Sequence, residues 1–183
     1  MPQGVTHILI PILIMSLIRD YVLSKNAKAH FPLHYVLIAG LGGVLPDIDI
    51  LLSIVLKFLG TQNWDLHKTF THSLFFPLVF LLVFIMIKPM HEKFKLCHVR
   101  KHTLNLSTIA LMLAFGTLVH IGLDSLFGEN VYWFYPFLMN DYGINLFSLT
   151  GLSWSTTAAL LDGILLVIWI VYLEAKHKIS DFI

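Results

Sequence analysis

Histidine and aspartate side chains recur at a few separate places along this 183-residue chain. Imidazole nitrogen and carboxylate oxygen are the donors that zinc and similar first-row divalent metals take from proteins, so these residues are candidate metal ligands. The single cysteine, Cys97, excludes an internal disulfide and a zinc site built on paired cysteines. The candidate ligands are His7, Asp47, Asp49, His67, His72, His120 and Asp124.

The composition predicts that membrane helices hold these residues. Hydrophobic residues make up 57% of the chain and charged residues 13%, whereas soluble domains carry about a quarter charged residues. Several apolar runs approach the ~20 residues that cross a bilayer, and none alternates as a barrel strand does. We therefore predict an all-α, polytopic bundle of about five transmembrane helices in one domain, residues 1–183. The predicted spans are residues 5–23, 33–58, 72–87, 106–127 and 155–173, the second one kinked or interrupted at its glycines and Pro46.

Lysine and arginine give the predicted orientation. Of the 12 such residues in the chain, ten fall on one side when the loops are taken alternately and two on the other, and the richer side faces the cytoplasm. We expect a multi-pass protein of the cell's inner or plasma membrane, with its N-terminus outside, its C-terminus in the cytoplasm and the aromatic-rich loop 128–154 outside. The first span is predicted to be retained, because Arg19, Lys25 and Lys28 follow it, whereas a signal peptide is basic before its apolar run.

The candidate ligands fall at one depth in these spans. With a rise of 1.5 Å per residue, Asp47 and Asp49 lie about 21 to 24 Å above the inner end of the second span, in its outer third. His120 and Asp124 are four residues apart, so one helical face presents both. Ionisable groups in hydrocarbon are costly unless they are paired or bind a metal, so such a layer predicts a functional site on the extracytoplasmic side.

Simpler interpretations exist for each of these residues taken alone. A buried histidine such as His7 often only forms a hydrogen bond, and His120 and Asp124 could pair within their helix. Asp47 and Asp49 could cap a helix that restarts after Pro46. Asp162 of the last span lies in the same layer, but the sequence gives it no role.

Three ordered motifs resemble the YdjM-like family of membrane-bound proteins, which are described as metal-dependent hydrolases. They are LPDID at residues 45–49, HKTFTHSL at 67–74 and HIGLD at 120–124, and an early histidine, here His7, belongs to the same pattern. The resemblance implies a helical inner-membrane protein in which these histidines and aspartates bind metal. Lys68 stands where the family commonly has arginine, and lysine lacks the bidentate fork of that residue. A looser likeness to zinc-dependent phospholipase C concerns the site alone.

The expected function is a metal-dependent hydrolase that attacks a phosphoester, such as a phospholipid headgroup, with water activated by the metal. Seven candidate ligands exceed the set that one zinc takes, which suggests two ions, of zinc or manganese, bridged by Asp124 or Asp47. Asp49 or His67 would accept a proton. Lys68 would neutralise a phosphate oxygen.

Two other classes of function compete with this prediction. A transporter for divalent metal would gather the same donors but should continue the polar path inward, where the spans are apolar apart from Arg19 and Asp20. A metal-stabilised structural or adaptor protein stays open. Membrane lipid is the solvent and a candidate substrate, no nucleic-acid partner is predicted, and the sequence does not indicate an oligomeric state.

Overall fold

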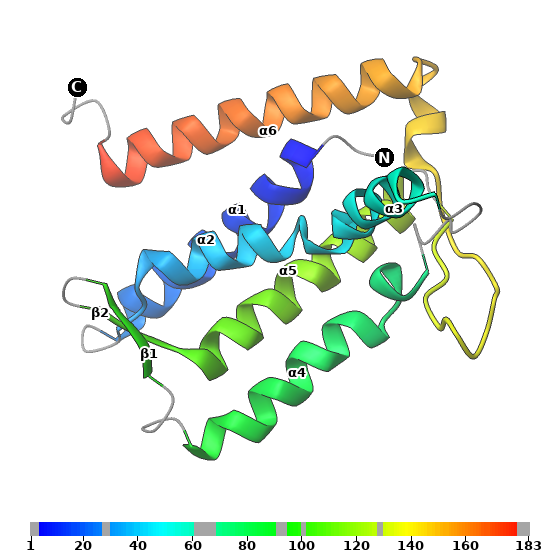
Figure 1. Ribbon diagram of the computed structural model, residues 1–183. Helices are drawn as coiled ribbons and strands as arrows, with labels where there is room; N and C mark the ends of the chain where they lie inside the picture. The colour runs from blue at the N-terminus through cyan, green and yellow to red at the C-terminus, as the bar shows by residue number, and fades with distance from the viewer. Residues whose placement is uncertain are drawn as a thin grey trace.

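The helices of this protein run side by side along a common direction, with one exception (Figure 1). The computed structural model describes residues 4–26, 30–60, 69–90, 95–99, 102–127 and 130–178. The elements in these ranges are α1 (Gly4–Lys25), α2 (Leu33–Gly42), η1 (Leu45–Asp47), α3 (Ile48–Phe58), η2 (Phe70–His72), α4 (Phe75–Ile87), η3 (Lys88–Met90), β1 (Lys95–Val99), β2 (His102–Asn105), α5 (Leu106–Phe127), η4 (Leu146–Thr150) and α6 (Trp154–His177). The predicted all-α class is confirmed, with one addition. The strands β1 and β2 pair antiparallel in a short hairpin that the sequence did not predict.

Three helices, α1, α5 and α6, are long and apolar enough to cross a membrane. The bent pair of α2 with the segment Leu45–Phe58 raises this number to four if the pair counts as one span. The third predicted span, residues 72–87, is represented by α4, which has 13 residues. Its length is about 20 Å at 1.5 Å per residue, short of a ~30 Å hydrocarbon core. By length and composition the described residues thus give three or four spans, and the count of five remains a prediction.

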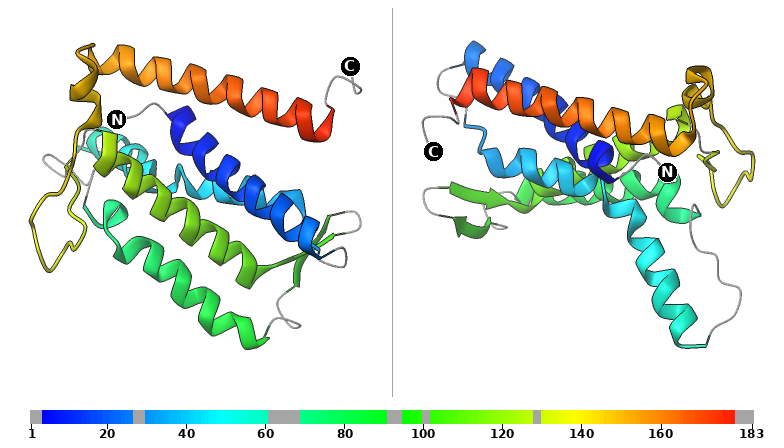
Figure 2. Two further views of the ribbon diagram at one scale, coloured as in Figure 1. Left: turned by 180° about the vertical axis from the view of Figure 1, so that it is seen from behind. Right: turned by 90° about the horizontal axis from the view of Figure 1, so that it is seen from above.

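The predicted interruption of the second span is present at η1. Pro46 has no backbone N–H to donate and disfavours α-helical geometry at the preceding residue, so α2 does not continue through it. The chain forms a 3₁₀ turn at Leu45–Asp47, and the two parts of the span meet at an angle of 43°. Beyond the bend, α3 leaves the bundle, as the view from above shows (Figure 2). The bend leaves Asp47 and Asp49 at the point where the helix changes direction.

The centre of the bundle is α5, which packs against α4, α2 and α1. Its seam with α2 is close because Gly42 and Gly116 lack side chains, and Gly43 in the same way allows α1 to lie close to the end of α2. A Cβ atom on Gly116 would overlap the carbonyl oxygen of Ala39, and one on Gly43 would overlap the carbonyl oxygen of His7. Small residues commonly allow such close contact between membrane helices. The backbones that carry the candidate ligands are therefore held close together.

Asp162 joins α6 to the rest of the molecule. Its Oδ1 accepts a hydrogen bond of 2.8 Å from the backbone N–H of Thr6 and another from the Thr6 hydroxyl. The first turn of α1 has N–H groups without intrahelical partners, and Asp162 satisfies one of them from a neighbouring helix. The side chain is 7% exposed. Asp162 therefore has a structural role, the attachment of α6 to α1.

The two ends of the bundle differ in construction. The hairpin and the C-terminal end of α6 lie at one end, and the start of α1, the start of α6 and the loop 130–150 lie at the other (Figure 1). The loop is fixed to α5 by hydrogen bonds from Trp133 Nε1 to Ser125 Oγ, at 2.7 Å, and from Ile144 N to the Ser125 carbonyl, at 2.7 Å. It is fixed to the start of α4 by a bond of 2.9 Å from Leu74 N to the carbonyl of Trp133. The end with this loop is the one that the sequence places outside the cell.

Candidate metal centre

Five of the predicted ligands meet at the loop-bearing end of the bundle. His7 comes from α1, Asp47 from η1, His72 from η2, and His120 and Asp124 from α5. The side chains of His7, His72, His120 and Asp124 are each at most 1% exposed, and that of Asp47 is 20% exposed. Segments far apart in the sequence thus supply one polar cluster, and its solvent-accessible member is Asp47.

Four candidate metal-binding atoms of this cluster lie close to one another. The Nε2 atoms of His72 and His120 are 3.2 Å apart. They lie 3.5 and 3.4 Å from Asp124 Oδ2, and 3.6 and 3.7 Å from Asp47 Oδ1. Donors that bind a tetrahedral zinc ion at about 2.0 to 2.2 Å stand roughly 3.3 to 3.6 Å from one another. The five observed separations are close to this spacing, and the donor atoms of Asp47, His72 and His120 form a group that could hold one small divalent ion.

The tautomer of His120 is fixed by the backbone. Its Nδ1 lies 2.7 Å from the carbonyl oxygen of Gly43, and because a carbonyl only accepts, this nitrogen must carry the proton and donate. In the neutral ring the lone pair is then on Nε2, the atom that faces the other donors. A hydrogen bond on the far nitrogen is the usual way in which proteins orient a metal-binding histidine.

A carboxylate fixes His72 in the same way. Asp49 Oδ2 lies 3.3 Å from His72 Nδ1, and the Thr71 hydroxyl donates to that oxygen at 2.5 Å. With the proton on Nδ1, the Nε2 lone pair of His72 also faces the cluster. Asp49, predicted as a ligand and as a proton acceptor, therefore lies behind His72, on the side away from the four donor atoms.

Two carboxylate oxygens of this cluster lack hydrogen-bond partners. Within the described part of the chain, Asp47 Oδ1 and Asp124 Oδ2 are buried atoms with no hydrogen-bond partner. In neutral rings protonated on Nδ1, the Nε2 atoms of His72 and His120, which are 3.2 Å apart, also present lone pairs. Burial of acceptors without a donor is costly. A cation at their centre removes this cost, and the donor set therefore fits a metal ion.

His7 contacts the other oxygen of Asp124. Its Nε2 lies 3.2 Å from Asp124 Oδ1, and its ring centroid is 4.1 Å from that of His120. Because a carboxylate only accepts, His7 Nε2 donates in this hydrogen bond. His7, His120 and Asp124 form a second group of potential metal donors, which shares His120 with the group of Asp47, His72 and His120.

The structure brings together five of the seven predicted ligands and places a sixth, Asp49, beside them. His67 and Lys68 lie outside the described residues. Sequence reasoning missed two participants, the Gly43 carbonyl and the Thr71 hydroxyl. Both belong to motifs that the sequence singles out, but their hydrogen bonds depend on contacts between separate segments.

Comparison with known proteins gives one match. The family described as YdjM inner membrane protein matches residues 1–179. No curated protein and no solved structure matches the chain. The matched range contains α1 to α6 and every residue of the metal-donor cluster. The chain therefore belongs to the YdjM inner membrane protein family.

Proposed function

We propose that this inner membrane protein is a metal-dependent hydrolase that acts on a phosphoester. The observation that carries the proposal is the buried cluster in which Asp47 Oδ1 and Asp124 Oδ2 lack hydrogen-bond partners and lie close to the Nε2 atoms of His72 and His120. When bound there, a zinc or manganese ion would supply Lewis acidity and lower the pKa of water toward neutrality. These four residues would hold the ion.

The protein's own part in this chemistry is to orient the donors before the ion binds. The Gly43 carbonyl and Asp49 keep the protons of His120 and His72 on the nitrogens away from the centre. His7 restrains Asp124 through its other oxygen. Partners of this kind commonly contribute 10- to 100-fold in metal affinity or activity, as an order of magnitude.

The donor arrangement favours one complete ion site. Four donors satisfy one zinc, and a second ion beside His7 would displace the hydrogen bond between His7 and Asp124. Asp124 would bridge in a two-ion site, because each of its oxygens faces a histidine nitrogen. The number of metal ions bound before and after the change His7→Ala separates the two arrangements. If His7 only orients Asp124, wild type and variant each bind one equivalent. If the centre holds two ions, the number falls from two equivalents in wild type to one in the variant.

The position of the centre favours a hydrolase over a metal conduit. The apolar core, which includes Ile12, Val36 and Met112, lies on the inner side of the cluster along α1, α2 and α5. A transport path would need polar groups at that depth. At the outer end, Asp47 is partly exposed and gives access from the surface. A phosphoester in a lipid headgroup would reach this level without leaving the membrane, and His67 and Lys68 are proposed to act on it there.

A metal-stabilised structural protein is the second candidate, because four protein ligands are typical of structural zinc sites. A catalytic centre needs an open position. Asp47 gives the two longest separations in the set, 3.6 and 3.7 Å, and is the most exposed of the four, so it is the ligand best placed to yield such a position.

The deciding experiment measures metal content and hydrolysis on the same preparations. Detergent-purified wild type, Asp47→Ala and His120→Ala are analysed by plasma mass spectrometry, with His30→Ala, a change at an exposed histidine, as the matched control. We expect at least one equivalent of metal in wild type and the control and loss in both site variants. Metal-dependent release of the headgroup from phospholipid, abolished by chelation, then supports the hydrolase. Bound metal without cleavage of any phosphoester tested would favour the structural role. If wild type binds no metal even after reconstitution, both the hydrolase and the metal-stabilised structural protein are contradicted.

A further inference from the structure

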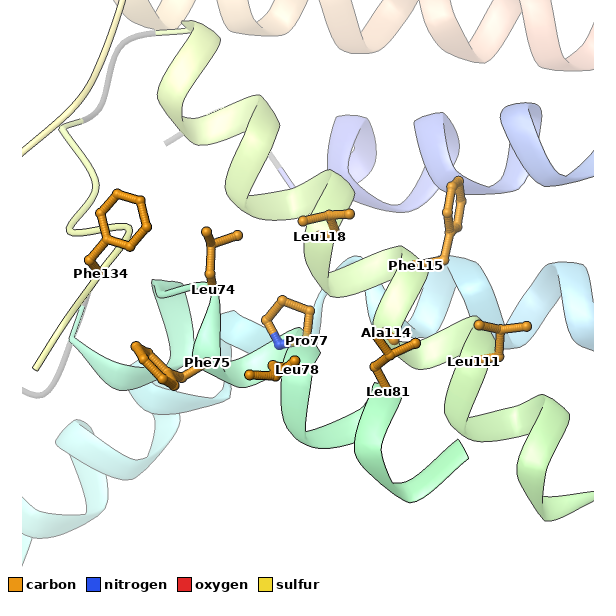
Figure 3. Close-up of a pocket in the computed structure, with 10 residues that line it drawn as sticks. All are labelled: Leu74, Phe75, Pro77, Leu78, Leu81, Leu111, Ala114, Phe115, Leu118 and Phe134. Atoms are coloured by element: carbon orange, nitrogen blue, oxygen red, sulfur yellow. The ribbon is translucent and has the colours of Figure 1, made fainter. Parts of the chain in front are cut away.

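A groove of about 580 Å³ follows the seam between α4 and α5 (Figure 3). Leu74 and Leu78 line it from the α4 side and Leu111 and Phe115 from α5, while Phe134 of the loop stands at one end. All ten residues that line it are apolar. Its volume is that of an ordinary small-molecule site, which is roughly 300 to 1,000 Å³. The metal centre does not use this groove.

The side chains around the groove are apolar and exposed. On α4 the side chains of Leu78, Leu82 and Ile85 are 42%, 50% and 56% exposed, and on α5 that of Leu118 is 47% exposed. In a membrane protein such a surface faces lipid tails. An occupant would therefore enter sideways from the bilayer, without passing through water.

The lining favours a flexible chain over a helix as the occupant. Membrane helices associate closely where small residues face each other, as Gly42 and Gly116 do between α2 and α5. Bulky leucine and phenylalanine side chains line the groove, and Ala114 is its one small aliphatic residue. A helix backbone could not come close to such a surface, whereas an alkyl chain fits between the side chains.

The groove ends beside the segment that supplies His72. Leu74, which lines it, is two residues beyond His72, and Leu118 is two residues before His120. The groove and the metal centre lie on opposite faces of α5, because His120 is fully buried and Leu118 is half-exposed. At this end η2 contacts η1, which carries the partly exposed Asp47. The headgroup of a lipid whose chain lay in the groove would thus rest at η2, next to the accessible side of the centre.

We propose that the groove between α4 and α5 binds an acyl chain of the phospholipid on which the metal centre acts. The proposal rests on the proposed hydrolase function for the identity of the lipid as substrate. It narrows the substrate class to phosphoesters that carry a long alkyl chain. Soluble phosphoesters would lack this anchor.

Photo-crosslinking tests the groove without catalysis. Wild type is placed in vesicles of phosphatidylglycerol that contain a fraction with a diazirine near the end of one acyl chain, after removal of metal by chelation. We expect peptides of α4 and α5 that line the groove to be labelled. Leu81→Trp, which fills the groove, should lower this labelling several-fold. Leu82→Trp, the same change at the next residue, outside the lining, is the matched control. Equal labelling in all three proteins would overturn the proposal, and so would a disulfide-linked dimer of Leu81→Cys in a Cys97→Ser background, since a second copy would then occupy the groove.

Hydrolysis by the metal-loaded proteins separates this proposal from the one on which it rests. Leu81→Trp should slow cleavage of long-chain phosphatidylglycerol and leave cleavage of a soluble glycerophosphodiester unchanged, whereas Leu82→Trp should change neither. Equal slowing of both substrates by Leu81→Trp would contradict a role in chain binding. If wild type cleaves neither substrate, the proposed hydrolase fails, while the labelling still decides whether the groove holds an acyl chain.

Discussion

Gly116→Ala should damage the metal centre although Gly116 contacts no metal donor. A Cβ atom at this position would overlap the Ala39 carbonyl oxygen and lie 2.7 Å from the backbone nitrogen of Gly43, closer than real Cβ contacts allow. Backbone atoms cannot rotate away, so α2 and α5 must separate by at least a few tenths of an ångström. The hydrogen bond of 2.7 Å from His120 Nδ1 to the Gly43 carbonyl spans the same seam, one helical turn further along.

The expected size of the effect follows from this shift. Metal sites tolerate distance errors of about 0.2 Å, so the separation should misplace His120 against Asp47. Loss of a partner that orients a ligand costs about 10- to 100-fold in metal affinity, and we expect a loss in that range. Overpacking also costs about 1 to 3 kcal/mol of stability. The higher helix propensity of alanine offsets up to about 1 kcal/mol of this loss of stability.

Gly122→Ala is the matched control on the same helix. A Cβ atom there meets nothing within 4 Å in the described structure, so this variant keeps the propensity gain without the clash. Zinc affinity would be measured by competition with a chelator in detergent, and stability by thermal unfolding followed by circular dichroism. The reasoning is refuted if Gly116→Ala binds zinc as tightly as Gly122→Ala does.

Three further predictions concern the surroundings of the centre. Asp49→Ala should weaken zinc binding by about 10- to 100-fold without abolishing it, because Asp49 orients His72 and is not among the four facing donors; complete loss of metal in the same chelator competition would make Asp49 a ligand. Asp162→Ala should lower the free energy of unfolding by about 1 to 3 kcal/mol, because it removes the hydrogen bonds from Thr6. It should also speed hydrogen exchange at the start of α1 and leave the metal content unchanged. Loss of metal would show that the contact between α6 and α1 also affects the geometry of the centre. In spheroplasts, an impermeant maleimide should label Cys97 of wild type only after lysis. It should label Leu149→Cys, made in a Cys97→Ser background, without lysis, because Leu149 is 80% exposed in the loop that is predicted to lie outside. The reverse pattern would show that the membrane orientation is opposite to the predicted one.

Much of the helical framework follows from local properties of the sequence. The apolar runs predict α1, α5 and α6 to within a few residues, because long hydrophobic stretches have few other stable structures in a membrane. Pro46 marks the break in the second span for a stereochemical reason that needs no tertiary information. The depth argument brings together His7, Asp47, His72, His120 and Asp124, since helical rise converts sequence position into height.

The roles within the centre depend on contacts that the sequence does not encode locally. Asp47 and Asp49 look equivalent in the motif LPDID, but the bend at η1 turns Asp47 toward the four-donor set and Asp49 toward the outer nitrogen of His72. The bond from Asp162 to Thr6 joins residues 156 positions apart. The predicted span 72–87 begins three residues before α4, because the sequence pattern does not show that the 3₁₀ turn Phe70–His72 is separate from the helix.

The attachment of α6 has a consequence for the order of biosynthesis. All residues of the four-donor set, together with His7 and Asp49, precede α6 in the chain, and α6 adds none of them. During synthesis from the N-terminus, the ligands are complete once α5 has been made. A nascent chain that has not yet inserted its last helix therefore already contains every candidate metal ligand. Insertion of α6 then completes the molecule when Asp162 engages the first turn of α1.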